Sequence, residues 1–348
     1  MTRIYLDHAA TTPLRPEARE AMLRGFEIWA NPSSPHAEGR KARAALEDAR
    51  ERVKTALGWE GEVIFTSGAS EALAIGLQRA KVDRRIVSAV EHDALFRAAP
   101  EAEVVPIPSL MAQVDLARLE DLLARPGKAV VAVQSLNSET GTFVLTDQGE
   151  TAATVRAAGG LLLCDCSQSA GKRPLPDCDM AVVSAHKVGG PTGIGALLVR
   201  DFSMLEPSGG QERGYRQGTE NLPAALGFAA ALEGGGLAGW ATGETQRFDF
   251  RKAVMDRGEG LILGPQCDWL FSLAHPTFSA QALLIKLDAM GFAVSAGSAC
   301  SSGTLKKSRV LDAFGIDDDT ASRTIRVSIG WNTTPAELDA FAQAWRSL

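Results

Sequence analysis

The sequence of 348 residues contains no hydrophobic run of the roughly 18 residues that a membrane-spanning helix needs. Its most apolar stretches, AVVAVQSL and GGLLLCDC, are short and are flanked by polar turns. The N-terminal segment MTRIYLDHAATTP lacks the long apolar core and the small-residue cleavage site of a signal peptide. We therefore expect a cytoplasmic protein with no membrane partner.

A basic patch is missing as well. The chain has 36 Lys and Arg residues against 42 Asp and Glu residues, a formal net charge of -6, and no long run of charge of one sign. Such a surface would not hold the phosphates of a nucleic acid, and its net charge would be repelled by an anionic membrane. We expect no nucleic-acid partner, and small-molecule chemistry or a protein partner instead.

Paired cysteines are also absent. The odd number of cysteines and the lack of C-x-x-C spacing fit neither a disulfide framework nor a structural zinc site. We expect reduced thiols and no metal site. The five residues are Cys164, Cys166, Cys178, Cys267 and Cys300.

What the sequence does contain is an alternation of short β-type runs with helical patterns. This alternation predicts an α/β fold in which helices cover a mostly parallel sheet. The clearest helix covers residues 36–57, where one face is apolar and Gly58 provides a stop, and a second covers residues 222–236. The β-type runs lie at residues 62–65, 85–90, 129–135, 161–165, 180–185 and 195–201.

The length of the chain exceeds that of a usual single domain. A glycine cluster followed by a polar stretch predicts a domain junction at residues 234–247. The shorter part after it has an α+β order that ends in a helix. We expect a large domain at residues 14–242 and a small domain formed by residues 1–13 with residues 243–348.

Polar residues follow several of the predicted strands, and ligands bind at the carboxyl ends of strands in open parallel sheets. In TSGASEA, Gly68, Ala69 and Ser70 open a helix, whose free N–H groups and positive dipole end suit a phosphate. An ordinary helix cap at Ser67 or Ser70 is the alternative.

Three further runs end in side chains that can do chemistry: His92, Asp165 and Lys187. Taken singly, a structural histidine, a buried ion pair and a solvated loop lysine would explain them. A phosphate site, a histidine, a strand-end aspartate and a lysine among small residues are together what a pyridoxal 5′-phosphate enzyme needs. The lysine binds the cofactor covalently, and the aspartate keeps the pyridine nitrogen protonated.

Nine segments occur along nearly the whole chain in a specific order. They are YLDHAATTP, NPSSPHAEGR, FTSGASEA, EH, CDCSQSAGK, SAHKVGGPTGIGAL, GGQERGYRQGTEN, SAGSACSSG and TIRVSIG. In this order they resemble the cysteine desulfurases of the class V aminotransferase group, with an SGSAC-type cysteine loop. The resemblance implies the fold-type I fold of pyridoxal phosphate transferases, with a mostly parallel large domain and a smaller α+β C-terminal domain.

The resemblance also implies an activity and partners. L-cysteine would be converted to L-alanine in a homodimer, and the sulfur would pass through an enzyme persulfide to an acceptor such as an iron-sulfur scaffold protein. Lys187, His92 and Cys300 would be catalytic. The expected contacts to the cofactor are Ala69, Ser70, His92, Ser138, Asp165, Gln168, Ser184, His186, Lys187 and, from the other subunit, Thr219.

Two residues match positions that contact the substrate. Arg326 matches an arginine that binds the substrate carboxylate, a task to which its forked guanidinium is suited. Asn31 lies in a loop that contacts substrate in the family, and a turn-forming Asn-Pro pair explains it equally well.

Cys300 matches the nucleophile, and it lies among serine, alanine and glycine residues that provide no apolar anchor. A thiol that attacks a bound substrate and then carries sulfur to an outside acceptor needs a segment that can move. We therefore expect residues 298–307 to be poorly ordered, or to leave Cys300 far from Lys187. The other four cysteines are expected to be passive.

Two departures from the family pattern leave alternatives open. Ser138 stands where relatives have an asparagine that contacts the cofactor ring, and serine reaches less far. The C-terminal helix is followed by little of the extension with which relatives dock an iron-sulfur scaffold. A selenocysteine lyase, another β-elimination enzyme, or a degenerate paralogue that binds without catalysis are the competing hypotheses.

Overall fold

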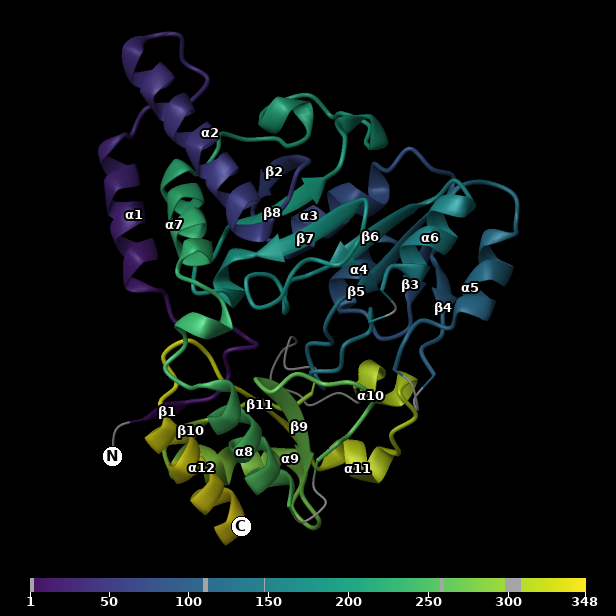
Figure 1. Ribbon diagram of the computed structural model, residues 1–348, viewed down its shortest axis with the longest axis vertical. Helices are drawn as coiled ribbons and strands as arrows, with labels where there is room; N and C mark the ends of the chain where they lie inside the picture. Colours follow the sequence, from purple (N-terminus) through teal and green to yellow (C-terminus); the bar gives the residue numbers. More distant parts are fainter. Residues whose placement is uncertain (1–2, 109–111, 147, 257–259, 298–307) are drawn as a thin grey trace.

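The computed structural model describes residues 3–108, 112–146, 148–256, 260–297 and 308–348. Figure 1 shows a larger body that contains the long sheet and helices α1 to α7, with a smaller body below it. The chain starts in the smaller body, crosses to the larger one, and returns to end beside its start. Both termini therefore lie in the smaller body.

The described part of the larger body contains a seven-stranded sheet in the order β2-β8-β7-β6-β5-β3-β4. Strands β7, β6, β5, β3 and β4 run parallel, and β8 is antiparallel to both of its neighbours. This confirms the mostly parallel α/β fold. The strands are β2 (Glu62–Thr66), β3 (Arg84–Ser88), β4 (Glu103–Val105), β5 (Ala129–Gln134), β6 (Leu161–Asp165), β7 (Met180–Ser184) and β8 (Gly195–Val199).

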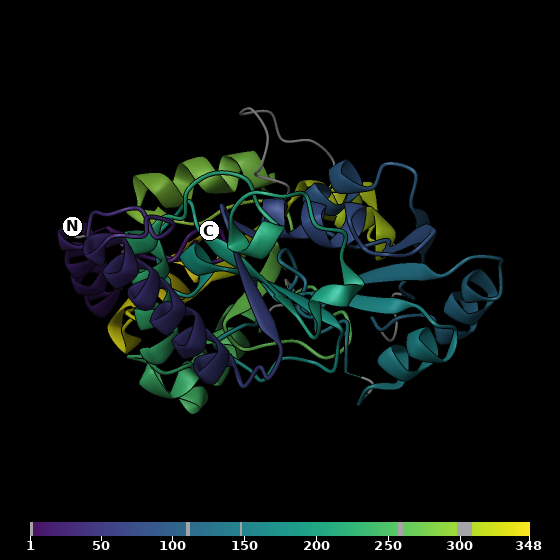
Figure 2. The ribbon, with the colours of Figure 1, turned by 90° about the horizontal axis from the view of Figure 1, so that it is seen from above.

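The sheet is covered on both faces, which is why its central strands are apolar without alternation. Along β5, Val131 and Val133 pack into one core cluster, while Val130 and Ala132 pack into the other. Seen from above, the sheet lies between the two helical layers (Figure 2). One layer contains α3 (Ala69–Gln78) and α4 (Asp93–Ala98); the other contains α1 (Pro16–Glu27), α2 (Ala37–Leu57), α5 (Leu116–Leu123), α6 (Glu150–Ala157) and α7 (Leu222–Glu233).

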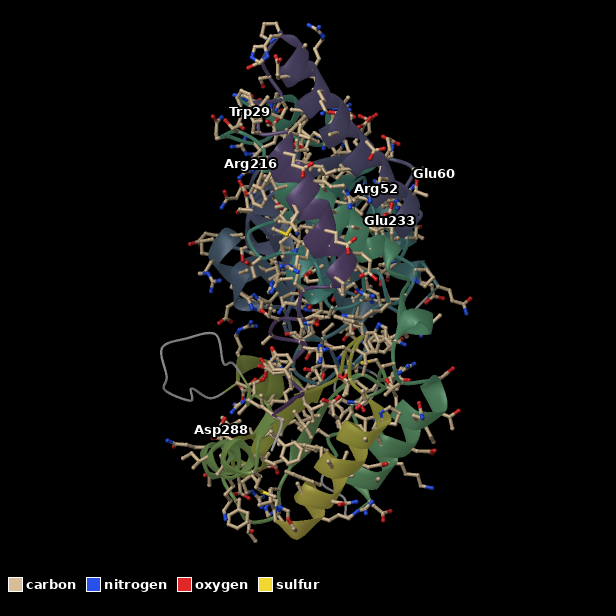
Figure 3. All side chains as sticks on the ribbon, turned by 90° about the vertical axis from the view of Figure 1, so that its left-hand side faces the viewer. Trp29, Arg52, Glu60, Arg216, Glu233 and Asp288 are labelled. Atoms are coloured by element: carbon tan, nitrogen blue, oxygen red, sulfur yellow. The ribbon has the colours of Figure 1, made fainter. Side chains whose placement is uncertain are left out.

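Helices α2 and α7 confirm two sequence predictions. Helix α2 ends at Gly58, whose φ of 64° lies in the left-handed region that favours glycine. Arg52 of α2 donates to both carboxylate oxygens of Glu233 on α7, at 2.7 and 2.6 Å. Figure 3 shows this pair on the surface, where it joins the two helices.

The smaller body has its own hydrophobic cluster, which includes Leu6, Phe250, Phe271, Ile325 and Phe341. The separate cluster supports the domain division at residues 14–242, which we keep as a proposal. Its elements are β1 (Ile4–Tyr5) parallel to β10 (Phe292–Ala293), β9 (Leu270–Ala274) antiparallel to β11 (Thr324–Ser328), and helices α8 (Glu244–Met255), α9 (Ala280–Ala289), α11 (Asp318–Ser322) and α12 (Pro335–Ser347). Helix α10 (Arg309–Ala313) instead packs through Val310 against the core of the larger body.

Helix α8 begins at Glu244, within residues 234–247, where the sequence predicts a domain junction; the junction itself stays a prediction. The side chain of Gln246 accepts from the N–H of Gly243 at 2.9 Å, and Phe250 and Val254 bury one face of the helix. The prediction missed this helix because its start is polar. Strands β4 and β9 and helices α1 and α11 were missed as well. Short 3-10 helices, η1 (Ala185–Lys187), η2 (Phe202–Met204), η3 (Glu212–Gly214) and η4 (Leu237–Gly239), complete the described chain.

Candidate active site

A cavity of about 510 Å³ lies at the carboxyl ends of the parallel strands. It is bounded by turns that follow β2, β3, β5, β6 and β7, and by residues of the smaller body. Ten of the site residues predicted from the sequence line it together: Ala69, Ser70, His92, Ser138, Asp165, Gln168, Ser184, His186, Lys187 and Arg326.

Lys187 reaches the cavity from η1, directly after the buried strand β7. Its Nζ donates to the carbonyl oxygens of Ala9 and of Ala10, the latter at 2.7 Å. Gln168 also donates to the Ala9 carbonyl from Nε2, at 3.0 Å. The N-terminal segment therefore holds the lysine and the glutamine beside each other.

His186 is held neutral beside that lysine. Burial and the positive charge of Lys187 lower the pKa of His186 to about 4. Its Nδ1 lies 2.9 Å from Oγ1 of Thr11. The imidazole therefore serves at pH 7 as a neutral hydrogen-bonding group.

The start of α3 carries no side-chain cap. Its N-cap residue is Gly68, with a φ of 153°, and no side chain accepts from the first turn of the helix. The predicted alternative of a cap at Ser67 or Ser70 is therefore wrong. The backbone N–H of Ser67 is instead bound by the carboxylate of Glu71, which also accepts from Nε of Arg216 at 3.2 Å. The N–H groups at this helix start suit an anion in the cavity.

Asp165 and His92 lie at the carboxyl ends of β6 and β3, with β5 between these two strands. Asp165 ends β6, is 9% exposed, and accepts from the N–H of Ser167 at 2.9 Å. His92 is the N-cap of α4, and its Nδ1 accepts from the N–H of Ala94 at 3.1 Å. That hydrogen bond places the proton of the neutral ring on Nε2.

Arg326 lies at the end of the cavity formed by the smaller body. From β11, its Nη2 donates to Oδ1 of Asp7 at 2.9 Å, and its Nη1 donates to the carbonyl of Ser138 at 3.0 Å. Ser295 donates to the same Asp7 oxygen at 2.8 Å. Nε of Arg326 has no hydrogen-bond partner among the described residues. The guanidinium is therefore oriented before any ligand binds.

Two buried carboxyl groups line the cavity that the sequence prediction did not assign. Oε1 of Glu91 accepts from Oγ of Ser88 at 2.5 Å and from the N–H of Gln134 at 2.7 Å, while Oε2 has no partner among the described residues. Burial and, to a smaller extent, the charge of Asp165 together raise the pKa of Glu91 to about 8, against the lowering effect of its hydrogen bonds. The position of Glu91 after a strand was the same signal that indicated Asp165.

Glu139 is the second of these groups. Burial raises the pKa of its carboxyl, which accepts from Oγ of Ser308 at 2.5 Å. The adjacent Asn137 is fully buried and accepts from the N–H groups of Glu139 and Thr140, at 3.0 and 2.9 Å. Asn137 therefore fixes the turn on which Ser138 lies.

Two predicted site residues do not line this cavity, and a third lies outside the described residues. Asn31 is exposed and its side chain accepts from the N–H of Ser33 at 2.9 Å, the geometry of a turn. Thr219 is exposed and does not line the cavity of its own chain. Cys300 and the rest of residues 298–307 lie outside the described residues, so the expectation for that segment stays a prediction.

The four described cysteines are all buried. Burial raises the pKa values of Cys164 and Cys178 well above their ordinary range, and that of Cys267 to about 12. A buried thiol without a stabilising cation remains protonated and is a poor nucleophile. These residues are therefore unsuited to carry a reactive sulfur.

The described residues contain neither a metal-binding cluster nor a membrane-spanning helix. No three His, Cys, Asp or Glu side chains gather there as a metal ion would require. No helix in the described part of the chain combines the length and the apolar character needed to cross a membrane.

The donor set fits pyridoxal phosphate. An uncapped helix start can take the phosphate, a strand-end carboxylate can face the ring nitrogen, and a lysine and an imidazole face the same space. The chain has the fold-type I fold of pyridoxal phosphate transferases. It is similar over 99% of its length, with a TM-score of 0.86, to a NifS-like protein from Rickettsia africae, which is 27% identical and 99% covered. A second NifS-like structure, 30% identical and 99% covered, also gives a TM-score of 0.86.

The chain belongs to the aminotransferase class-V family, which it matches over residues 4–341, and within it to the cysteine desulfurases. It is 36% identical to the cysteine desulfurase of Cereibacter sphaeroides, in a match that covers 97% of this chain and 94% of that protein. The IscS-like cysteine desulfurase of Mycobacterium tuberculosis is also 36% identical, with 97% of this chain and 93% of that protein covered.

Proposed function

We propose that the protein is a pyridoxal phosphate-dependent cysteine desulfurase that converts L-cysteine to L-alanine and leaves the sulfur on Cys300 as a persulfide. The observation that carries the proposal is the convergence of Lys187, Asp165, His92 and Arg326 on one cavity. A lysine, a carboxylate, an imidazole and a guanidinium are the groups that this chemistry requires.

Several residues would hold the cofactor. The N–H groups of Ala69 and Ser70, with Ser184 and His186, would bind its phosphate, and Lys187 would bind it covalently. Asp165 would pair with the ring nitrogen, while Gln168 and Ser138 would contact ring substituents. When bound, the ring withdraws electrons and so stabilises negative charge on the substrate.

The chain itself would supply the orientation of the substrate and the movement of its proton. The guanidinium of Arg326 would bind the substrate carboxylate, since its direction is already fixed by Asp7. Lys187 would take the α-proton at Nζ. His92, whose Nδ1 is occupied by a backbone N–H, would act through Nε2.

The sulfur transfer is assigned to Cys300. Its thiolate would attack the sulfur of the bound substrate, so that an S–S bond forms, the C–S bond breaks, and the electron pair stays with the substrate carbon. That carbon then gains a proton and leaves in alanine. The burial of the other four cysteines supports this assignment.

The proposal includes a homodimer in the cytoplasm. Exposed Thr219 would reach the phosphate of the other subunit. Helix α1 exposes Leu23 and Phe26, Trp29 just beyond its end is 79% exposed, and such an apolar surface favours contact with a second chain. Figure 3 labels Trp29 on the same side of the molecule as Arg216, which precedes Thr219 by three positions in the sequence. The proposed acceptor of the sulfur is an iron-sulfur scaffold protein.

The test is incubation of the purified protein, loaded with pyridoxal phosphate, with L-cysteine and a reductant. The proposal predicts alanine and sulfide in equal amounts, and neither from Lys187→Ala. Cys300→Ser should retain the absorbance of the bound cofactor and lose sulfide release. Release of both products by Cys300→Ser at the wild-type rate would contradict the assigned nucleophile, and turnover of L-selenocysteine alone would indicate a selenocysteine lyase.

A further inference from the structure

Arg309, the first residue of α10, reaches from the C-terminal part of the chain to the turn that carries His92. Its Nη1 donates to the carbonyl of Ala89 at 2.8 Å. Its Nη2 donates to the carbonyl of Glu91 and, at 3.2 Å, to Oδ1 of Asp93. One guanidinium therefore binds acceptors on both sides of His92 in the sequence.

The guanidinium of Arg309 also stacks on an aromatic ring. Cζ of Arg309 lies 3.8 Å from the centroid of the Phe96 ring, on the helix that His92 caps. Hydrogen bonds from a charged donor are stronger than neutral ones, and a planar fork can bind several acceptors while it stacks on an aromatic ring. A lysine at this position would keep the charge without the fork.

The carbonyl of Val90, which lies between the two carbonyls bound by Arg309, also accepts hydrogen bonds. Val90 O accepts from the side chains of Gln134 and, at 3.2 Å, of Asn137. Buried side chains therefore hold the turn from the sheet, and Arg309 holds it from α10. Because the backbone of residues 89–93 sets where the imidazole of His92 enters the cavity, the direction of the ring depends on both sets of contacts.

We propose that Arg309 is a positioning residue for His92, which fixes the direction of the imidazole in the cofactor cavity through the carbonyls of Ala89 and Glu91 and the carboxylate of Asp93. The importance of this direction for catalysis depends on the proposed function. The geometric role does not, and it is measurable without cofactor. Small displacements of a catalytic group lower rates by about 10- to 100-fold while substrate binding is largely kept.

The experiment compares Arg309→Met and Arg309→Lys with wild type and with Arg323→Met as the matched control. Arg323 also belongs to the C-terminal part, and donates to the Pro276 carbonyl and to Oδ2 of Asp319, the latter at 2.5 Å, away from the cavity. Imidazole NMR signals are recorded on each protein without cofactor. The chain has five histidines, so His92→Gln assigns the signal.

We expect Arg309→Met to shift the His92 signals and its titration midpoint, Arg309→Lys to shift them less, and Arg323→Met to leave them at the wild-type values. In the loaded enzyme, Arg309→Met should lower kcat by about 10- to 100-fold with KM changed less than about threefold. The circular dichroism of the bound cofactor should weaken in parallel. If Arg309→Met fails to fold, the comparison of Arg309→Lys with wild type tests the proposal instead.

Unchanged His92 signals in Arg309→Met and Arg309→Lys would overturn the proposal, as would equal shifts in Arg323→Met. If the signals shift as expected while the loaded wild-type protein does not release alanine from L-cysteine, the positioning role stands and the proposed function fails. The two claims are therefore tested separately.

Discussion

Arg326 and Asp7 form a partly buried ion pair, with Nη2 of the arginine 2.9 Å from Oδ1 of the aspartate. The pair joins β11 to the segment that follows β1, and Ser295 donates to the same carboxylate oxygen. The guanidinium also donates to Ser138, on the turn of the larger body that lines the cavity. The group proposed to bind the substrate carboxylate therefore ties the N-terminal segment, the C-terminal part and the large sheet together.

Arg326→Lys should raise KM for L-cysteine by about 10- to 100-fold, because a bidentate hydrogen bond between charged groups of roughly 1.5–3 kcal/mol is lost. Arg323→Lys, away from the cavity, is the control and should leave KM unchanged. Steady-state assays of alanine release test this. A lysine variant with wild-type KM would show that another group binds the carboxylate.

Glu91→Gln should change how stability depends on pH. The folded protein holds the pKa of Glu91 at about 8, above its ordinary value of 4.5. This group therefore contributes stability that is fully present below about pH 4.5 and is lost as the pH rises through about 8. Urea unfolding at pH 6 and pH 8.5 should show a smaller loss for Glu91→Gln than for wild type. Equal losses in both proteins would contradict the raised pKa.

His186→Gln should change the pH dependence in the opposite direction. The pKa of His186 is lowered to about 4 from its ordinary value of 6.5, so its contribution to stability is present above pH 6.5 and is lost as the pH falls through about 4. The free energy of unfolding between pH 7 and pH 4 should therefore fall less in the variant. A steeper fall than in wild type would refute the assignment.

Two ion pairs of different burial give a matched comparison of stability. Arg50 donates to both oxygens of Glu212, at 2.8 and 3.1 Å, and both side chains are almost fully buried. Glu212→Gln leaves the buried Arg50 with only the more exposed Glu47, at 3.3 Å, as a counter-charge and should cost about 3–5 kcal/mol. Glu233→Gln removes the exposed partner of Arg52 and should cost about 0–1 kcal/mol. Denaturant unfolding would contradict this account if the two costs were equal.

Alkylation of the native protein should modify none of the four buried cysteines, because their thiols are shielded and burial keeps at least three of them protonated. Peptide mass spectrometry after brief treatment with iodoacetamide measures this, with the unfolded protein as the control for reactivity. We expect Cys300 to be the modified residue. Rapid modification of Cys164 or Cys267 in the native protein would contradict the description of the buried thiols.

The strands and the centre of the site were predictable because each depends on local sequence. Runs such as LLLC are apolar along their whole length, as a strand covered on both faces requires, and β6 occupies that run together with the Asp165 that ends it. Asp165 ends one such strand and Lys187 closely follows another, so the parallel sheet brings them to one edge. The short edge strand β4 and the polar start of α8 gave no comparable signal.

The partners of the site residues were not predictable, since they depend on contacts between distant segments. The pairing of Asp7 with Arg326 spans 319 positions, and that of Thr11 with His186 spans 175. Arg309 gave no signal in the sequence either, because two of its three acceptors are backbone carbonyls and all three are distant in the sequence. For Asn31, the sequence left two interpretations open, a loop that contacts substrate and a turn-forming Asn-Pro pair. The structure shows the turn and places Asn31 outside the cavity of its own chain.

The central claim is tested most directly by a single turnover. The protein loaded with pyridoxal phosphate is mixed with less than one equivalent of L-cysteine without reductant. Alanine is quantified, and the mass of the peptide that contains Cys300 is measured by mass spectrometry. We predict one alanine for each cysteine consumed and a gain of one sulfur atom on Cys300, with neither in Lys187→Ala. Formation of pyruvate, or of alanine without added sulfur on Cys300, would contradict the account.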